Sequence, residues 1–198
     1  MEHLSREQVI ALLTQARAVR ERDWVLFLVA FWHGLRASEA VSLTAGNFAD
    51  GYLNVQRLKG SLRTVQPLVE HESELLNEKL AVAKWIKQVA EWRSNSETSP
   101  LSPPQAGGAT TPRLFPISRV QFYRLMRRYG RAAGIPQHLC HPHVLKHSIA
   151  MQSIGQAGIE NVRQYLGHRS ISSTGAYLKV SDEAASKAIL SSFSAGSK

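Results

Sequence analysis

Cysteine is almost absent from this sequence, because Cys140 is the only one in 198 residues. A single thiol excludes an internal disulfide framework and is typical of a protein in a reducing cytoplasm. Long hydrophobic runs are also missing, since the longest, Trp24 to Trp32, is too short to span a bilayer. The first residues, MEHLSREQ, lack the basic start and apolar core of a signal peptide. We therefore expect a cytoplasmic protein.

Acidic residues are scarce as well, with 15 Asp and Glu against 24 Lys and Arg and a formal net charge of +9. None lies between Thr98 and Ile159, a stretch whose basic residues are Arg113, Arg119, Arg124, Arg127, Arg128, Arg131 and Lys146. This imbalance favours a polyanionic partner, with nucleic acid ahead of an anionic membrane surface. The hydrophobic content of 43% predicts a sizeable core and excludes global disorder.

Residue patterns predict a mainly α-helical chain with a small antiparallel β-sheet, an α+β fold. Capping boxes predict helices over about 5–17 and 118–133. An almost entirely apolar stretch, 22–33, predicts a buried helix. Alternating residues predict a hairpin with strands at 52–56 and 64–68. Further helices are expected over 38–43, 72–92 and 182–193, and another that begins at His143.

Residues 94–112 are rich in Ser, Pro, Thr and Gly, a composition typical of a flexible loop. A loop of this kind can separate two domains. The part of the chain before it has only a thin core, however. We therefore expect an insertion within a single domain that spans residues 1–198.

The helix predicted over 118–133 has a basic face formed by Arg124, Arg127, Arg128 and Arg131. Phe122, Leu125, Met126 and Tyr129 take much of the remaining surface. A solvated basic face is the simplest interpretation. In a stretch without acids we favour a helix laid along or into a groove of DNA.

The stretch from His143 to Tyr177 holds several candidate catalytic groups. Helical spacing places His143 and Lys146 on one face, and Gly167 predicts a helix end that leaves His168 at a loop corner. Tyr177, nine residues later, is free to approach the same place. Two imidazoles, a cation and a phenol together suggest chemistry on a phosphate. Taken singly, each of these residue types is more often structural.

Three further polar residues stand near the start of the chain. Arg36 lies just past the predicted buried helix with Glu39 three residues on, so its charge would sit at the edge of the core. The alternative is a surface ion pair, which contributes little to stability. Lys59 lies near the predicted hairpin tip. It is either a solvated lysine or a mobile cation able to reach a bound ligand.

These segments resemble the signature boxes of the tyrosine recombinases, the phage-integrase family. The similar segments are HGLRASEAVSL at 33–43, HPHVLKHSIA at 141–150 and YLGHRSISSTGAY at 165–177, and LNVQRLKGSLRTVQPL resembles the family's hairpin with its mobile lysine. The resemblance covers about residues 5 to 190. It implies a tyrosine recombinase catalytic-domain fold, and site-specific recombination with integration, excision or inversion as the outcome.

The resemblance also implies a role for each matching residue. Arg36 would bind the scissile phosphate, with Glu39 orienting it, and Lys59 would protonate the leaving 5′-hydroxyl. His143 would assist proton transfer near the tyrosine, and His168 would donate to a phosphate oxygen.

Tyr177 would attack phosphorus and form a 3′-phosphotyrosyl link. A covalent intermediate conserves the phosphodiester energy, so we expect neither a cofactor nor a metal. The expected partners are double-stranded DNA and further copies of the chain, four in the synaptic complex. The predicted helix at 182–193 would dock on a neighbouring subunit through Ile189, Leu190 and Phe193.

The sequence departs from the family pattern at two points. The pattern has His-x-x-Arg in its second box, whereas Lys146 stands here. Arg offers phosphate a rigid bidentate fork and Lys a flexible point charge, which predicts either a slower reaction or a site adapted to Lys. Most relatives also carry an N-terminal core-binding domain, and this chain starts almost at the catalytic domain. In size it resembles the short fimbrial-switch recombinases.

Three other functions are compatible with parts of the sequence. A DNA-binding regulator of the same fold that has lost catalysis has Lys146 as its only support. A type IB topoisomerase shares the chemistry, but the spacing of the boxes favours a recombinase. A zinc module would use the cluster His138, Cys140, His141, His143 and His147. Zinc requires four ligands in a closed geometry, which a single Cys and Pro142 fit poorly.

Overall fold

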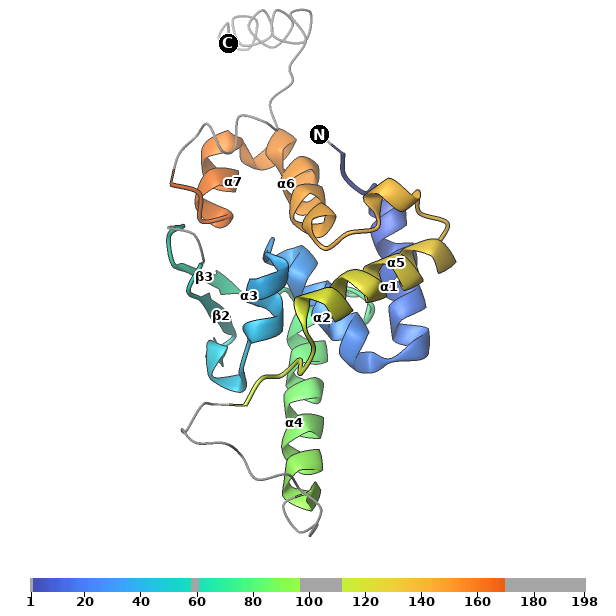
Figure 1. Ribbon diagram of the computed structural model, residues 1–198. Helices are drawn as coiled ribbons and strands as arrows, with labels where there is room; N and C mark the ends of the chain where they lie inside the picture. The colour runs from blue at the N-terminus through green and yellow to red at the C-terminus, as the bar shows by residue number, and fades with distance from the viewer. Residues whose placement is uncertain (1, 58–60, 97–111, 170–198) are drawn as a thin grey trace, which may run out of the picture.

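The computed structural model describes residues 2–57, 61–96 and 112–169 (Figure 1). These residues form helices and a small three-stranded antiparallel sheet, which confirms the predicted fold class. The helices are α1 (Arg6–Val19), α2 (Glu21–Trp32), α3 (Ala37–Ser42), α4 (Glu78–Ser96), α5 (Arg119–Ala132), α6 (His143–Ala157) and α7 (Ile159–Tyr165), with single 3₁₀ turns at Ala45–Asn47 and Gln137–Leu139. In this described part, no helix is long and apolar enough to cross a membrane.

Helix α2 forms the centre of the core. Its residues from Asp23 to Phe31 are all buried, and it packs against α1, α3, α4 and α6. The prediction of a buried helix is therefore confirmed. The ring of Phe27 stacks on Phe122 of α5 at 5.5 Å between centroids and meets the edge of Tyr129 at 5.7 Å. These contacts turn the apolar face of α5 inward.

The sheet consists of β1 (Phe48–Ala49), β2 (Tyr52–Val55) and β3 (Thr64–Pro67). Strands β2 and β3 form the predicted hairpin, with Val55 opposite Thr64. Strand β1, which was not predicted, pairs with β2. The side chains of Leu53 and Val55 point into the core, and the alternation continues to a buried Arg57. The predicted hairpin tip, with Lys59, lies outside the described residues.

Two predicted boundaries were wrong. Helix α4 begins at Glu78 rather than at 72, because the chain first makes a turn and Asn77 Oδ1 accepts a hydrogen bond from the backbone N–H of Leu80 at 3.1 Å. The helix then continues to Ser96, so residues 94–96 of the expected loop are helical. Residues 97–111 lie outside the described part. A break at Gly158, between α6 and α7, was also not predicted.

Both capping boxes were predicted correctly. Ser5 accepts from the backbone N–H of Gln8 at the start of α1, and Ser118 accepts from that of Gln121 at the start of α5. In each case the glutamine side chain accepts from the backbone N–H of the serine. A short local pattern was enough here because capping needs only groups that are close in sequence.

Two glycines allow segments from opposite ends of the chain to pack closely. Gly34 follows α2 with φ +56°, and a Cβ there would lie 2.5 Å from Leu166 Cδ2. Gly167 follows α7 with φ +67°, and a Cβ there would lie 2.8 Å from the carbonyl oxygen of Leu62 and 3.1 Å from Arg57 Cγ. Both positions combine a left-handed backbone with a contact that leaves no room for a side chain.

Replacing Gly34 tests this close approach. Gly34→Ala should lower the free energy of unfolding by about 2–6 kcal/mol, because left-handed strain and overpacking each cost about 1–3 kcal/mol. Gly134→Ala is the matched control, since Gly134 also has a positive φ of +70° but nothing lies within 4 Å of its added Cβ. In Gly134→Ala the free energy of unfolding should fall only by the cost of the left-handed strain. Urea denaturation of both variants measures the difference, and equal losses would contradict the packing described.

Candidate active site

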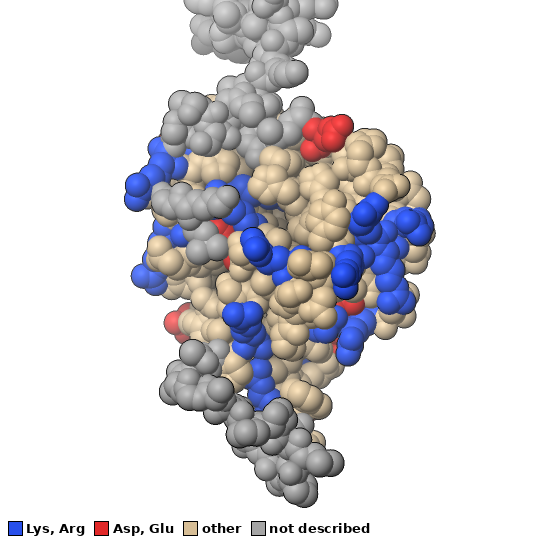
Figure 2. All heavy atoms as spheres, in the orientation of Figure 1, with Lys and Arg blue, Asp and Glu red and all other residues tan. Residues whose placement is uncertain are grey.

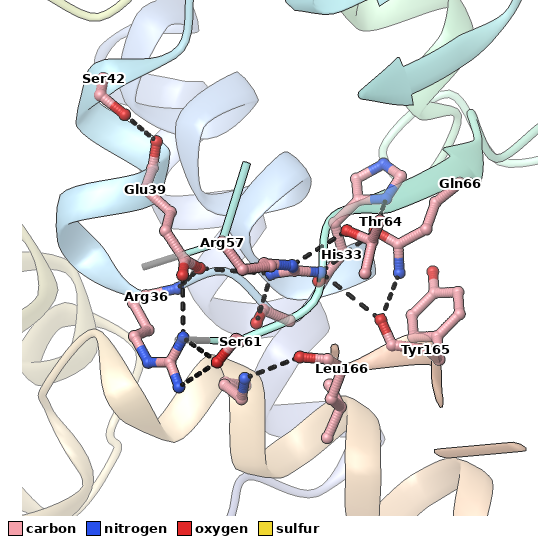
Figure 3. Close-up of polar contacts among 12 residues, drawn as sticks. His33, Arg36, Glu39, Ser42, Arg57, Ser61, Thr64, Gln66, Tyr165 and Leu166 are labelled. Carbon is pink, nitrogen blue, oxygen red and sulfur yellow. Dashed lines mark hydrogen bonds and ion pairs between the residues drawn. The ribbon is translucent and has the colours of Figure 1, made fainter. Parts of the chain in front are cut away.

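The predicted catalytic residues of the described part come together from both ends of the chain. The loop after α2 supplies Arg36, the first turn of α6 supplies His143 and Lys146, and the loop after α7 supplies His168. Figure 3 shows the loop after α2, the hairpin and the end of α7 meeting through polar contacts. Two of the predicted residues, Lys59 and Tyr177, lie outside the described residues.

Arg36 and Glu39 form an ion pair whose acidic partner is buried, rather than a pair on the surface. The carboxylate of Glu39 is completely buried, and its Oε1 accepts from Arg36 Nη1 at 2.9 Å. Glu39 Oε2 also accepts from the backbone N–H of Arg36 at 2.8 Å, which caps α3. The Arg36 side chain keeps 23% of its surface exposed, and its guanidinium donates to Ser61 Oγ at 3.3 Å. Arg36 is thus held from behind while part of it faces outward.

A second arginine, Arg57, also pairs with Glu39, and this residue was not predicted from the sequence to be part of the site. Its side chain is fully buried, and Nη1 donates to Glu39 Oε2 at 3.2 Å. The available signal was the alternation of β2, which places Arg57 on the inward face two residues after Val55. A basic residue in a core position needs an acidic partner, and Glu39 is that partner.

Lys146 is the third cation of this cluster. It is 2% exposed, and Nζ donates to the carbonyl oxygen of Leu166 at 3.4 Å. Burial, together with the charges of Arg36 and Arg57, lowers the pKa of Lys146 to about 7. Among the described residues that act on this pKa, Glu39 is the only anion. One carboxylate therefore faces three basic side chains, and a bound anion would complete the balance of charge.

His168 occupies the loop corner predicted from Gly167. Its backbone is fixed from both sides, because its N–H donates to the carbonyl oxygen of Arg163 at 3.0 Å and its carbonyl accepts from Arg163 Nη1 at 2.6 Å. Burial, followed by the charge of Lys146, lowers the pKa of His168 to about 4. The imidazole is therefore neutral at pH 7 and offers one N–H donor.

His143 keeps an exposed face at the first turn of α6. Its ring meets the edge of His147 at 4.5 Å between centroids. Desolvation of the rest of the ring, followed by the charge of Lys146, lowers the pKa of His143. A neutral imidazole on the open side of the cluster is suited to accept a proton.

The described histidines and Cys140 do not support the zinc interpretation. Cys140 is buried, and its thiol donates to the carbonyl oxygens of Ile135 and Pro136. Within residues 2–57, 61–96 and 112–169, no group of three or more His, Cys, Asp or Glu side chains is placed to hold a metal ion.

Basic side chains lie around the cluster on an open face. The residues Arg124, Arg127, Arg128 and Arg131 of α5 are all exposed, as the helical spacing predicted. Figure 2 shows many Lys and Arg side chains and few acidic ones on this side of the molecule. A pocket of about 340 Å³ connects α5 to the cluster and is lined by Ala37, Arg119, Tyr123, His141, Pro142 and His143.

The chain is similar to known proteins over almost its full length. The sequence model of the Phage integrase family matches residues 2–184. The type 1 fimbriae regulatory protein FimE of Escherichia coli (strain K12) is 32% identical over 164 residues, which cover 81% of this chain and 75% of FimE. Tyrosine recombinase XerD of Xanthomonas campestris pv. campestris is 31% identical over 168 residues, covering 80% of this chain and 48% of XerD.

The fold is similar to that of solved recombinases. The crystal structure of XerA recombinase matches with a TM-score of 0.69 and 20% sequence identity. The match covers 96% of this chain and 65% of the XerA chain, so the chain spans a little under two thirds of that protein. This similarity confirms the predicted architecture.

Proposed function

This chain belongs to the phage integrase family, and from that premise we propose that it is a site-specific recombinase that cuts and rejoins double-stranded DNA. The observation that carries the proposal is the cluster of Arg36, Lys146 and His168 around the buried Glu39. Its open side has a positive charge that suits a phosphodiester. Integration, excision and inversion all use this same chemistry.

In the proposed reaction, Arg36 and Lys146 bind the non-bridging oxygens of the scissile phosphate. The phenol oxygen of Tyr177 attacks phosphorus and gives its proton to a base, for which His143 is the candidate. The P–O5′ bond breaks, and Lys59 protonates the leaving 5′-oxygen, which becomes a hydroxyl. His168 donates its N–H to an oxygen of the pentavalent phosphorus, where negative charge develops.

Lys146 can perform the role that the family pattern gives to arginine. In the free protein its pKa of about 7 leaves it partly deprotonated at neutral pH. A phosphodiester next to Nζ adds a negative charge, which favours the protonated form. The phosphate would thus complete its own binding site. The rigid fork of an arginine is replaced by a point charge that forms when the substrate arrives.

A DNA-binding regulator of the same fold is the second candidate. FimE carries the word regulatory in its name, and Lys146 departs from the family pattern. However, burying Arg57 and Lys146 costs free energy, and DNA binding alone does not require that cost. The exposed arginines of α5 are sufficient for binding. The buried cluster therefore favours catalysis.

The protein is proposed to act as a homo-oligomer on DNA, with four copies in synapsis, because two duplexes require four strand cleavages. We infer a single domain, since buried residues on both sides of 97–111 share one core. An apolar groove of about 330 Å³ between α6 and α7 is proposed to receive residues 182–193 of a neighbouring copy. It is lined in part by Trp32, Ile149, Ala150, Val162 and Leu166.

Covalent trapping tests the proposed function. The wild-type protein is incubated with nicked duplexes from both sides of its own gene and with a nicked random-sequence pool. We expect an SDS-resistant adduct in which Tyr177 carries a 3′-phosphate, formed equally in EDTA. Tyr177→Phe should form no adduct and bind DNA as the wild type does, since only the nucleophilic oxygen is lost.

Each alternative has its own result in this experiment. DNA binding without any adduct would favour the regulator. An adduct that persists in Tyr177→Phe would show that another residue attacks, and a strict metal requirement would contradict the mechanism.

The salt dependence of binding tests the basic face of α5. Replacing Arg124, Arg127 and Arg131 with Gln should flatten the slope of log affinity against log salt by up to about 0.9 for each phosphate that the helix no longer binds. Arg128 is left in place because its guanidinium lies 5.6 Å from the Tyr129 ring centroid.

The matched control removes three charges from α4, where Lys79, Lys84 and Lys87 stand among acidic residues. Their replacement by Gln should change the slope much less. Equal changes in the two triple variants would mean that α5 makes no specific contribution to binding.

A further inference from the structure

Arg57 is a buried cation that the proposed reaction does not use. Its side chain is fully buried, and all three nitrogens of its guanidinium donate to acceptors within the described protein, so no donor is left for DNA. Burial is the main cause that lowers its pKa, and the charge of Glu39 acts in the opposite direction. Keeping such a residue in the core is costly unless its charge is fully paired and its donors are satisfied. Its contacts therefore indicate what it does.

The carboxylate of Glu39 lies between Arg57 and Arg36 (Figure 3). Oε1 accepts from Arg36 Nη1 at 2.9 Å, and Oε2 accepts from the backbone of Arg36 at 2.8 Å and from Arg57 Nη1 at 3.2 Å. Helix α3 has only six residues. A side chain on so short a helix depends on tertiary contacts for its position, and Arg57 supplies one from the far side.

Arg57 itself is fixed by backbone and side-chain acceptors on three elements. Nη2 donates to the carbonyl oxygens of His33 at 2.8 Å and Tyr165 at 3.5 Å, and Nη1 donates to that of Gly34 at 3.3 Å. Nε donates to Thr64 Oγ1 at 3.0 Å. The acceptors lie in several directions around the side chain. A planar guanidinium has enough donors to reach all of them, and an ammonium group does not.

Gln66 extends this frame to α4. Its Nε2 donates to the carbonyl of Tyr165 at 2.9 Å, and Arg57 donates to its Oε1 at 3.3 Å, so both ends of the amide are assigned. His33 Nδ1, 3.0 Å from the same Oε1, must then be a donor. Its Nε2 lies 2.7 Å from Glu78 Oε1, a buried contact that links the frame to α4.

We propose that Arg57 is a positioning residue for phosphate binding, which acts on Arg36 through the shared carboxylate of Glu39. The inference rests on the proposed function, because the scissile phosphate is the ligand of Arg36. In this role Arg57 does not itself bind the phosphate. It sets the direction in which the Arg36 guanidinium points, and the frame of His33, Gln66 and Tyr165 holds Arg57 in turn.

The test uses Arg57→Lys, which keeps the charge but loses the fork, and Arg57→Met, which loses both. Arg63→Met is the matched control, because Arg63 lies on the same hairpin with its guanidinium exposed and bonded to Asn54. The duplex recovered by covalent trapping serves as substrate. Arg57→Lys should slow adduct formation by roughly 10- to 100-fold, less than loss of a preorganised donor itself. DNA affinity should stay within about twofold, since phosphate contacts elsewhere dominate binding.

A double-mutant cycle separates positioning from a general structural role. In an Arg36→Ala background, Arg57→Lys should have almost no further effect on the rate, because it acts through the missing guanidinium. A structural role would give additive losses. In parallel, nuclear magnetic resonance of ¹⁵N-arginine-labelled protein reports rotation of the Arg36 guanidinium without DNA. This rotation should become faster in Arg57→Lys and stay unchanged in Arg63→Met.

The outcomes separate this inference from the proposed function. Additive losses, or a wild-type rate together with an unchanged Arg36 signal in Arg57→Lys, would overturn the positioning role. If the wild-type protein forms no adduct on any duplex, the proposed function fails. The rotation of the Arg36 guanidinium then decides alone whether Arg57 positions it. Should Arg57→Met fail to fold, Arg57→Lys provides the comparison.

Discussion

One buried carboxylate, that of Glu39, holds together side chains that would otherwise repel each other. Arg36 and Arg57 both bond to it, and Lys146 lies close enough for their charges to lower its pKa. Buried charges are tolerated only where partners and hydrogen bonds compensate for lost water. Glu39 compensates for part of the positive charge, and the remainder is directed at the open side. In our account this incomplete neutralisation is what makes the site a receptor for a phosphodiester.

The geometry of the cluster depends on close packing between distant parts of the chain. Gly34 lets the loop after α2 approach Leu166, and Gly167 lets the loop after α7 approach the hairpin at Leu62 and Arg57. The same contacts place the carbonyl of Leu166 above Lys146 Nζ. Backbone positions that exclude a side chain therefore determine where the cations lie. Such a site is sensitive to small displacements of the backbone, since a shift of one segment moves several side chains of the cluster together.

The sequence predicted the elements whose signals are local. Serine caps, apolar periodicity and alternation located α1, α2, α5 and the hairpin, and helical spacing placed the α5 arginines on one face. The start of α4 was misplaced, because residues before Glu78 form a turn and Asn77 caps the helix by accepting from the N–H of Leu80, a local signal that the prediction overlooked. Arg57 was missed for a different reason. Its role comes from partners in α3, β3 and the end of α7, which no window of sequence contains, although the alternation of β2 gave a hint.

We propose that a phosphate completes the site through Lys146. Nuclear magnetic resonance of lysine-labelled Tyr177→Phe protein can follow the Lys146 ammonium during a pH titration, alone and with the duplex recovered by trapping. We expect a pKa of about 7 in the free protein and a clearly higher pKa with DNA, because the scissile phosphate favours the charged form. A duplex with an uncharged methylphosphonate at that position should raise it far less. A Lys146 pKa that is ordinary in the free protein, or that responds equally to both duplexes, would show that the phosphate does not complete the site through this residue.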